Sequence, residues 1–284
     1  MKTCISSLTQ GVLKFSYMKA LERYTHEDRQ KIIDRLTPVV QTEFGDNFLA
    51  FAAIASFARH EDSHYSDLEL VVFVKEMTDP LKVFGIGKIV DGMLVELYCY
   101  TPQGYLKEVR DVSKNWIISG SDRLLPIVNA ELIADLNNYS VANMHEECLK
   151  QAVLHWPEVQ ESAGKVMNAI SGGNRDGLML VSASMIERML EVLSFLNAVP
   201  FVTFSRFISQ AKSFSTKPRN WDHLVDMFNA GIPDQDVFAA LVDEVITDFE
   251  LIFESRGCTL YDCRDPVEMV AALKSLVEKK QSLN

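Results

Sequence analysis

The chain has 284 residues, 48% of them hydrophobic, so it can bury one large core or two smaller ones and does not have the composition of a disordered protein. Its net charge is −11, with 28 basic against 39 acidic residues and no cluster of lysine or arginine. Because proteins that bind nucleic acid normally present a basic face to the phosphates, this charge excludes nucleic acid as the main partner. A small cationic substrate fits the charge better, although many proteins are acidic for solubility alone.

No apolar run reaches the roughly 18 to 20 residues that a membrane-spanning helix needs, and the first residues show no secretory signal. We therefore expect a cytoplasmic protein that does not act on a membrane. The cysteines are five in number, scattered and without zinc-binding spacing: Cys4, Cys99, Cys148, Cys258 and Cys263. This pattern predicts reduced thiols rather than a disulfide framework or a metal knuckle.

The first half of the chain mixes helix and strand signals. Residues 24–46 predict an amphipathic helix, with Thr25 as its N-cap and Asp28 completing an approximate capping box. Apolar and alternating runs predict strands or buried segments at residues 48–56, 68–74, 93–100 and 117–130, the last at an edge of the sheet.

From about residue 141 onward the pattern is helical. The helical segments are residues 145–156, 157–170, 177–198, 205–214, 234–257 and 266–280. Because strands and helices fall in separate halves, the sequence predicts an α+β fold. We expect a mixed sheet with helices over residues 1–140, followed by an all-α helical domain over residues 141–284.

Carboxylates stand among residues that are otherwise suited to burial. Asp67 directly precedes the strand at residues 68–74 and Glu69 is its second residue, and residues two apart in extended chain share a face, about 7 Å from each other. Two like charges on one half-buried face repel unless a cation lies between them. Glu96 stands in the strand at residues 93–100, so pairing of the two strands would bring three carboxylates together. Such a cluster predicts a magnesium site, although a solvated strand end is the simpler explanation for Glu96 alone.

The acids belong to a longer pattern, S-x-x-R followed by Y-S-D-x-E, here Ser56, Arg59, Tyr65, Ser66, Asp67 and Glu69. This pattern resembles the motif of the nucleotidyltransferase superfamily, and within it that of the kanamycin nucleotidyltransferases, which are aminoglycoside 4'-nucleotidyltransferases. Two later blocks match in the same order. In the first, E-x-A-G-K contains Glu161, Gly164 and Lys165; in the second, residues 202–224 contain Thr203. The resemblance covers roughly residues 24 to 264.

The resemblance implies a nucleotidyltransferase-type sheet domain followed by a helical domain for substrate binding and dimerisation. It also implies transfer of a nucleoside monophosphate from ATP or another NTP to a hydroxyl of a small acceptor such as an aminoglycoside. Magnesium would be held by Asp67 and Glu69, with Glu96 as the third carboxylate. The nucleotide would be bound by Ser56, Arg59, Ser66, Lys165 and Thr203.

In this family Glu161 would be the general base, and the subunits of a homodimer would share each active site. Glu161 and Lys165 lie four residues apart, so an exposed ion pair on a helix is the ordinary alternative. Gly164 between them is costly in a helix and would be explained by the close approach of a neighbour.

One departure bears on activity. Ala55 replaces the glycine of the family's G-S pair, where glycine permits an unusual φ and close backbone approach. The methyl group is expected to crowd the triphosphate or to shift the loop. Two readings stay open: an active nucleotidyltransferase, or a catalytically decayed protein that binds a nucleotide or a partner on the same fold.

Overall fold

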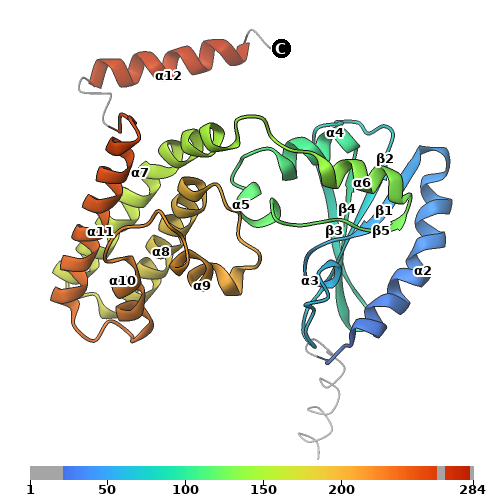
Figure 1. The fold of residues 1–284 in the computed structure, drawn as a ribbon, viewed down its shortest axis with the longest axis horizontal. Coiled ribbons are helices and arrows are strands. Elements are labelled where there is room, and N and C mark those ends of the chain that lie inside the picture. The colour runs from blue at the N-terminus through green and yellow to red at the C-terminus, as the bar shows by residue number, and fades with distance from the viewer. Residues whose placement is uncertain (1–21, 261–265, 282–284) are drawn as a thin grey trace, which may run out of the picture. The chain divides into compact units, whose positions relative to one another are not determined.

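A five-stranded mixed sheet and a set of helices make up the computed structural model, which describes residues 22–260 and 266–281 (Figure 1). The chain divides into two compact units. Unit 1 comprises Met1–Met144 and Val199–Phe204, and unit 2 comprises His145–Ala198 and Ser205–Asn284. The chain therefore returns to unit 1 at Val199–Phe204, which we call the return segment. A single domain boundary near residue 140 does not account for this segment. No helix in the described part of the chain is long and apolar enough to cross a membrane.

The strands of unit 1 follow the spatial order β3-β4-β2-β1-β5. Their bounds are β1 Phe48–Ala53, β2 Leu68–Val74, β3 Phe84–Val90, β4 Met93–Tyr100 and β5 Leu125–Val128. β2 and β4 are parallel, and every other pair is antiparallel. The strands expected at residues 68–74 and 93–100 are confirmed. The segment expected at 48–56 is a strand only as far as Ala53, since Ala55 and Ser56 begin α3, and β5 lies at an edge as expected but is shorter. The sequence analysis missed β3, an exposed edge strand with two glycines.

Unit 1 also contains short and long helices. They are α2 His26–Phe44, η2 Gly45–Asn47, α3 Ala55–Ala58, α4 Pro102–Tyr105, η3 Leu106–Arg110, α5 Trp116–Ser119 and α6 Ala130–Asn138. The capping box of α2 is confirmed: the Asp28 backbone N–H donates to the Thr25 hydroxyl, and the Thr25 backbone N–H donates to the Asp28 carboxylate. The sequence analysis missed α5, which occupies the start of the segment expected to be a strand, and α6.

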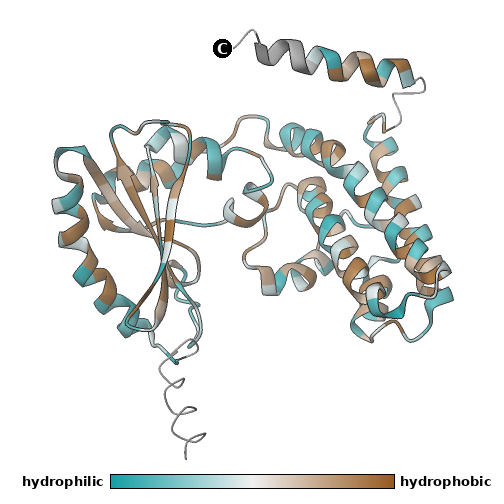
Figure 2. Cartoon of the chain, turned by 180° about the vertical axis from the view of Figure 1, so that it is seen from behind, coloured by the Kyte–Doolittle hydropathy of each residue, from teal (hydrophilic) through white to brown (hydrophobic). Residues whose placement is uncertain are grey.

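The sheet has a core on each face. On one face Ile32, Ile33 and Val40 of α2 pack against the even-numbered residues of β2, from Leu68 to Val74. On the other face Ile133 and Leu136 of α6, together with Tyr105 and Val109, pack against Val71 and Phe73. The strands are accordingly apolar along much of their length, while α2 carries alternating polar and apolar bands (Figure 2). Asp67 and Glu69 therefore belong to the face that α6 and Tyr105 cover.

Unit 2 is helical, as expected. Helices after residue 143 are α7 Met144–Ser171, α8 Arg175–Asn197, η4 Phe204–Arg206, α9 Phe207–Lys212, α10 Trp221–Asn229, α11 Gln235–Ser255 and α12 Pro266–Gln281. The split expected at Pro157 is wrong, because α7 continues through it. The reason is a continuous buried stripe at residues 148, 152, 156, 159, 163 and 166, which keeps one helix face packed on both sides of the proline.

Candidate functional site

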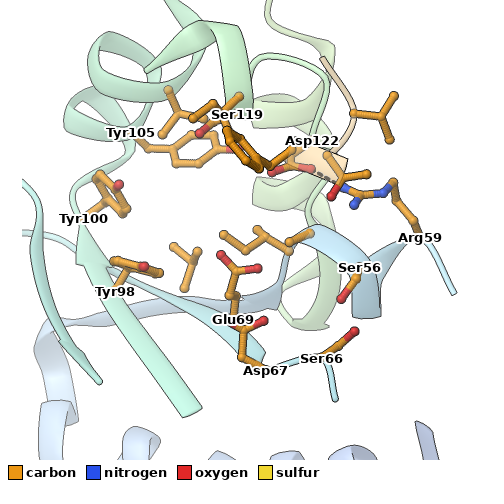
Figure 3. Close-up of a pocket in the computed structure, with 18 residues that line it drawn as sticks. Ser56, Arg59, Ser66, Asp67, Glu69, Tyr98, Tyr100, Tyr105, Ser119 and Asp122 are labelled. Atoms are coloured by element: carbon orange, nitrogen blue, oxygen red, sulfur yellow. Dashed lines mark hydrogen bonds and ion pairs between the residues drawn. The ribbon is translucent and has the colours of Figure 1, made fainter. Parts of the chain in front are cut away.

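A pocket of about 460 Å³ lies within unit 1, on the sheet face that carries Glu69 (Figure 3). Its lining comes from the segment between Ile54 and Arg59, from the sheet residues around Asp67 and Tyr98, from the short helices α4, η3 and α5, and from the return segment Val199–Phe204. Its polar and ionisable lining residues are Ser56, Arg59, Ser66, Asp67, Glu69, Tyr98, Tyr100, Tyr105, Ser119, Asp122 and Thr203. The pocket thus brings together six of the residues predicted from the sequence.

Asp67 and Glu69 both line the pocket and are half-buried. Neither carboxylate forms an ion pair with any residue that the structure describes. Burial, followed by the charges of Asp67, Asp122 and Glu96, raises the pKa of Glu69 to about 7. Burial, followed by the charge of Glu96, also raises the pKa of Asp67. Burial and the neighbouring acids thus disfavour the ionised form of both groups. A divalent cation bound between them would offset that cost, because carboxylate oxygens are the ligands that a hard cation prefers.

Glu96 lies beside Glu69 across the β2–β4 pair, in direct register. Paired residues of parallel strands point to the same face, so the three carboxylates share one face as expected. Glu96 does not line the pocket, however, and its carboxylate accepts a hydrogen bond of 2.9 Å from the Tyr98 hydroxyl. It therefore lies near Asp67 and Glu69 without completing a tight triad.

Arg59 lies at the end of α3 and already has an acidic partner. Its guanidinium donates to Asp122 at 2.5 Å and to Glu61 at 3.2 Å, and Figure 3 shows the Arg59–Asp122 pair at the edge of the pocket. Burial raises the pKa of Asp122 to about 6, even though Arg59 acts in the opposite direction. The sequence analysis missed Asp122, because it reaches the pocket only through the fold.

Ala55 and Ser56 are the first two residues of α3, directly after the turn that leaves β1. Ala55 has a φ of 55°, in the left-handed region that favours glycine. The backbone at this position thus has the conformation for which the family's glycine is suited, and the alanine adopts it with strain. Ser56 lines the pocket one residue later.

Arg29 holds the loop that presents Ser66 and Asp67. The Arg29 side chain is fully buried, pairs with Asp62 at 2.9 Å, and donates to the backbone carbonyls of Ser63 at 2.8 Å and Ser66 at 2.5 Å. The Ser66 hydroxyl accepts from the Ser63 backbone N–H at 2.9 Å. The sequence analysis did not single out Arg29, although a charged residue on the buried face of a helix is a signal that could have found it.

Three tyrosines form the side of the pocket opposite Ser56 and Ser66, with Glu69 between (Figure 3). Tyr98 and Tyr100 come from β4, and Tyr105 comes from α4. Burial raises the pKa of all three, and that of Tyr100 to about 12, so each is a neutral phenol at physiological pH. The three tyrosines form no recognisable motif in the sequence, so only the fold identifies them as pocket residues.

Glu161 and Lys165 belong to α7 in unit 2, whereas Thr203 lines the pocket of unit 1. The Lys165 ammonium and the Glu161 carboxylate form an exposed ion pair of 2.8 Å, and this lysine lowers the pKa of Glu161. The geometry is that of the ordinary helix-surface pair. No described atom lies within 4 Å of a Cβ added at Gly164, so the close neighbour expected there is absent among the described residues.

His155 belongs to a group of possible metal ligands in unit 2. Its ring, the Glu158 carboxylate and the Glu191 carboxylate offer ligand atoms within 4.8 Å of one another on α7 and α8. Arg188 already pairs with both acids, at 2.9 Å from Glu158 and 3.3 Å from Glu191. A protein cation therefore already pairs with both carboxylates of this group. Among the cysteines, Cys99, Cys148 and Cys258 are free thiols as expected, and Cys4 and Cys263 lie outside the described residues.

No protein-family model matches the chain, and no curated protein matches its sequence. Among solved structures, the chain is similar to a nucleotidyltransferase-like protein from Exiguobacterium sibiricum. The two are 12% identical, with a TM-score of 0.45, over 79% of this chain and 75% of that one. A likeness at that level leaves the activity of this chain to be argued from its own residues.

Proposed function

We propose that this protein is a nucleotidyltransferase and that the pocket of unit 1 binds a nucleoside triphosphate together with a divalent metal ion. The observation that supports it most is the pair Asp67 and Glu69: two half-buried carboxylates on one face of a strand, without an ion-pair partner among the described residues. Burying such charges is costly, and chemistry that uses a cation gives them a reason to be there.

Asp67 and Glu69 would hold the metal, with Glu96 contributing negative charge from the neighbouring strand. Magnesium fits these donors, because it prefers oxygen ligands and shares them with substrate phosphates. When bound, it would neutralise charge on the reacting phosphates. Ser56 and Arg59 would contact phosphate oxygens, and a guanidinium has enough donors to keep Asp122 and still face an anion.

The transfer step needs a base and an acceptor. Glu161 would take the proton from an acceptor hydroxyl as that oxygen attacks the α-phosphorus, and the bond to pyrophosphate would break in the same displacement. Lys165 would contribute positive charge toward the phosphates. We further propose a homodimer whose subunits complete each other's sites, and a small hydroxyl-bearing acceptor that is cationic, such as an aminoglycoside. The net charge of −11 supports a cationic acceptor.

The alternative is a protein that has lost catalysis and binds a nucleotide or a partner. The strained Ala55 backbone favours it, because a methyl group stands where the motif has none. The presence of all the acidic residues that the family's site uses, Asp67, Glu69, Glu96 and Glu161, favours the active enzyme. Incubation with labelled ATP and magnesium against a panel of acceptors, with pyrophosphate release as the readout, separates the two.

Binding of Mg-ATP tests the site itself. Asp67→Asn and Glu69→Gln remove one charge each and keep the shape, so we expect both to abolish metal-dependent ATP binding measured by calorimetry. Glu76→Gln is the matched control, because Glu76 is an exposed acid just beyond the other end of β2. If both pocket variants bind Mg-ATP as the parent does, the nucleotide site is elsewhere.

A further inference from the structure

Two phenol hydroxyls in the pocket have no hydrogen-bond partner among the described residues. Tyr100 is 8% exposed and Tyr105 is 2% exposed, and both line the pocket. Buried hydroxyls are normally hydrogen-bonded, because leaving one unsatisfied costs free energy. The two side chains are buried overall, and each lines the cavity with a hydroxyl that no described residue bonds.

The contacts of Tyr100 and Tyr105 with the protein are made by their rings. The two rings meet edge to face at 5.6 Å, and Tyr105 meets Phe73 in the same way at 5.3 Å. Such packing fixes both rings and leaves the hydroxyls free to meet a ligand. Tyr98 differs, because its hydroxyl donates to Glu96.

The two sides of the pocket differ in the chemistry of their side chains. Ser56, Ser66 and Arg59 lie on one side and the tyrosines on the other, with Glu69 between (Figure 3). Val109 and Ile118 add apolar surface to the lining. An apolar wall with a few hydrogen-bonding groups suits an uncharged ring that has polar atoms on its edge.

We propose that Tyr100 and Tyr105 bind the nucleobase of the nucleotide, with their hydroxyls hydrogen-bonded to its polar edge. The inference rests on the proposed function, which assigns the phosphates to the side of Ser56 and Arg59. A nucleotide carries its triphosphate and its base on opposite sides of the ribose. A base would therefore extend toward the tyrosines when the phosphates lie at the serines.

Nucleotide binding with and without a base tests this proposal. The probes are ATP, GTP, CTP, UTP and inorganic tripolyphosphate, each with magnesium, titrated into the full chain. In Tyr100→Phe and Tyr105→Phe we expect at least one nucleotide to bind about 2- to 10-fold more weakly, the effect of one net hydrogen bond. Tripolyphosphate affinity should stay unchanged. The control is Tyr139→Phe, which removes a hydroxyl that is bonded to Asp111 outside the pocket.

Stability separates a ligand contact from a structural role. Because neither hydroxyl bonds to the protein, both variants should keep the melting temperature of the ligand-free parent or raise it. If the variants lose equal affinity for nucleotides and tripolyphosphate, or lose no affinity for any nucleotide, the inference is overturned while the proposed function stands. If the parent binds neither nucleotides nor tripolyphosphate, the proposed function fails and the inference fails with it.

Discussion

Ala55 turns the chain from β1 into α3 with a φ of 55°, and its methyl group makes that turn costly. A left-handed backbone costs an L-residue about 1–2 kcal/mol relative to glycine. Glycine loses about 0.4–1 kcal/mol through its freer unfolded chain. We therefore expect Ala55→Gly to be neutral or to stabilise by up to about 1.5 kcal/mol in urea unfolding. Ala58→Gly, at the last residue of α3 and without a positive φ, should destabilise by about 0.4–1 kcal/mol through the freer unfolded chain. If both variants lose the same free energy of unfolding, the backbone at Ala55 is not strained.

Glu161 tests the proposed chemistry at the level of one atom. Glu161→Gln keeps the shape and removes the basic oxygen, so turnover should fall by about 10²- to 10⁴-fold. Mg-ATP affinity should change little, because proton transfer develops only in the transition state. Glu147→Gln is the control, since it breaks a similar 2.8 Å pair with Lys150 on the same helix. Equal turnover in the two variants would remove Glu161 from the mechanism.

At the scale of elements, Arg29 ties α2 to the loop before β2. Arg29→Ala would leave the buried Asp62 carboxylate and the Ser63 and Ser66 carbonyls without this donor. Breaking a buried pair costs about 3–5 kcal/mol, and we expect a loss of that order in chemical denaturation. Arg35→Ala on the same helix breaks only an exposed pair with Asp91 and should cost less than about 1 kcal/mol. Similar losses for both would show that the buried contacts contribute little.

The Asp248 carboxylate ties α11 to the loop before α10. It accepts from the Arg219 backbone N–H at 2.9 Å and from its guanidinium at 2.7 Å, and these bonds lower the pKa of Asp248 below its usual 3.8. A group whose folded pKa is lowered contributes stability above its unfolded pKa and loses it as the pH falls. The stability difference between the parent and Asp248→Asn, from urea unfolding at several pH values, should thus be full above about pH 5 and shrink below about pH 4. A constant difference down to pH 3 would contradict this linkage.

The sequence could predict the elements and residues that have a local pattern, but not those that are defined by contacts between distant parts of the chain. The apolar residues of β2 are consecutive, and those of α2 recur at helical spacing. Both patterns are local, so the positions of β2 and α2 could be predicted. β3 has glycines and exposed residues, so nothing local marked it, and its partner β4 defines it. Asp67 and Glu69 were found because two residues on one strand share a face. Asp122 and Tyr105 were missed, because only the fold brings them to the same pocket.

At the scale of the whole molecule, the return segment Val199–Phe204 makes unit 1 discontinuous. Phe201 is fully buried, its N–H donates to the Ile117 carbonyl at 2.8 Å, and its own carbonyl accepts from the Ser121 hydroxyl at 2.9 Å. Phe201→Ala should therefore destabilise the protein by about 3–5 kcal/mol in urea unfolding. Phe204→Ala, whose side chain is 69% exposed, should cost less than about 1 kcal/mol. A small loss for Phe201→Ala would mean that unit 1 does not depend on this segment.

The same segment sets the order in which a growing chain can finish its pocket. Chains leave the ribosome from the N-terminus at about 5–20 residues per second, and domains fold as they emerge. All five strands precede α7 and α8, whereas Thr203 and Phe204, which also line the pocket, follow both helices. A nascent chain therefore holds Asp67 and Glu69 on a sheet whose pocket is still missing part of its wall. A chain that stops within α8 would keep the acids of the site without a finished place for a substrate.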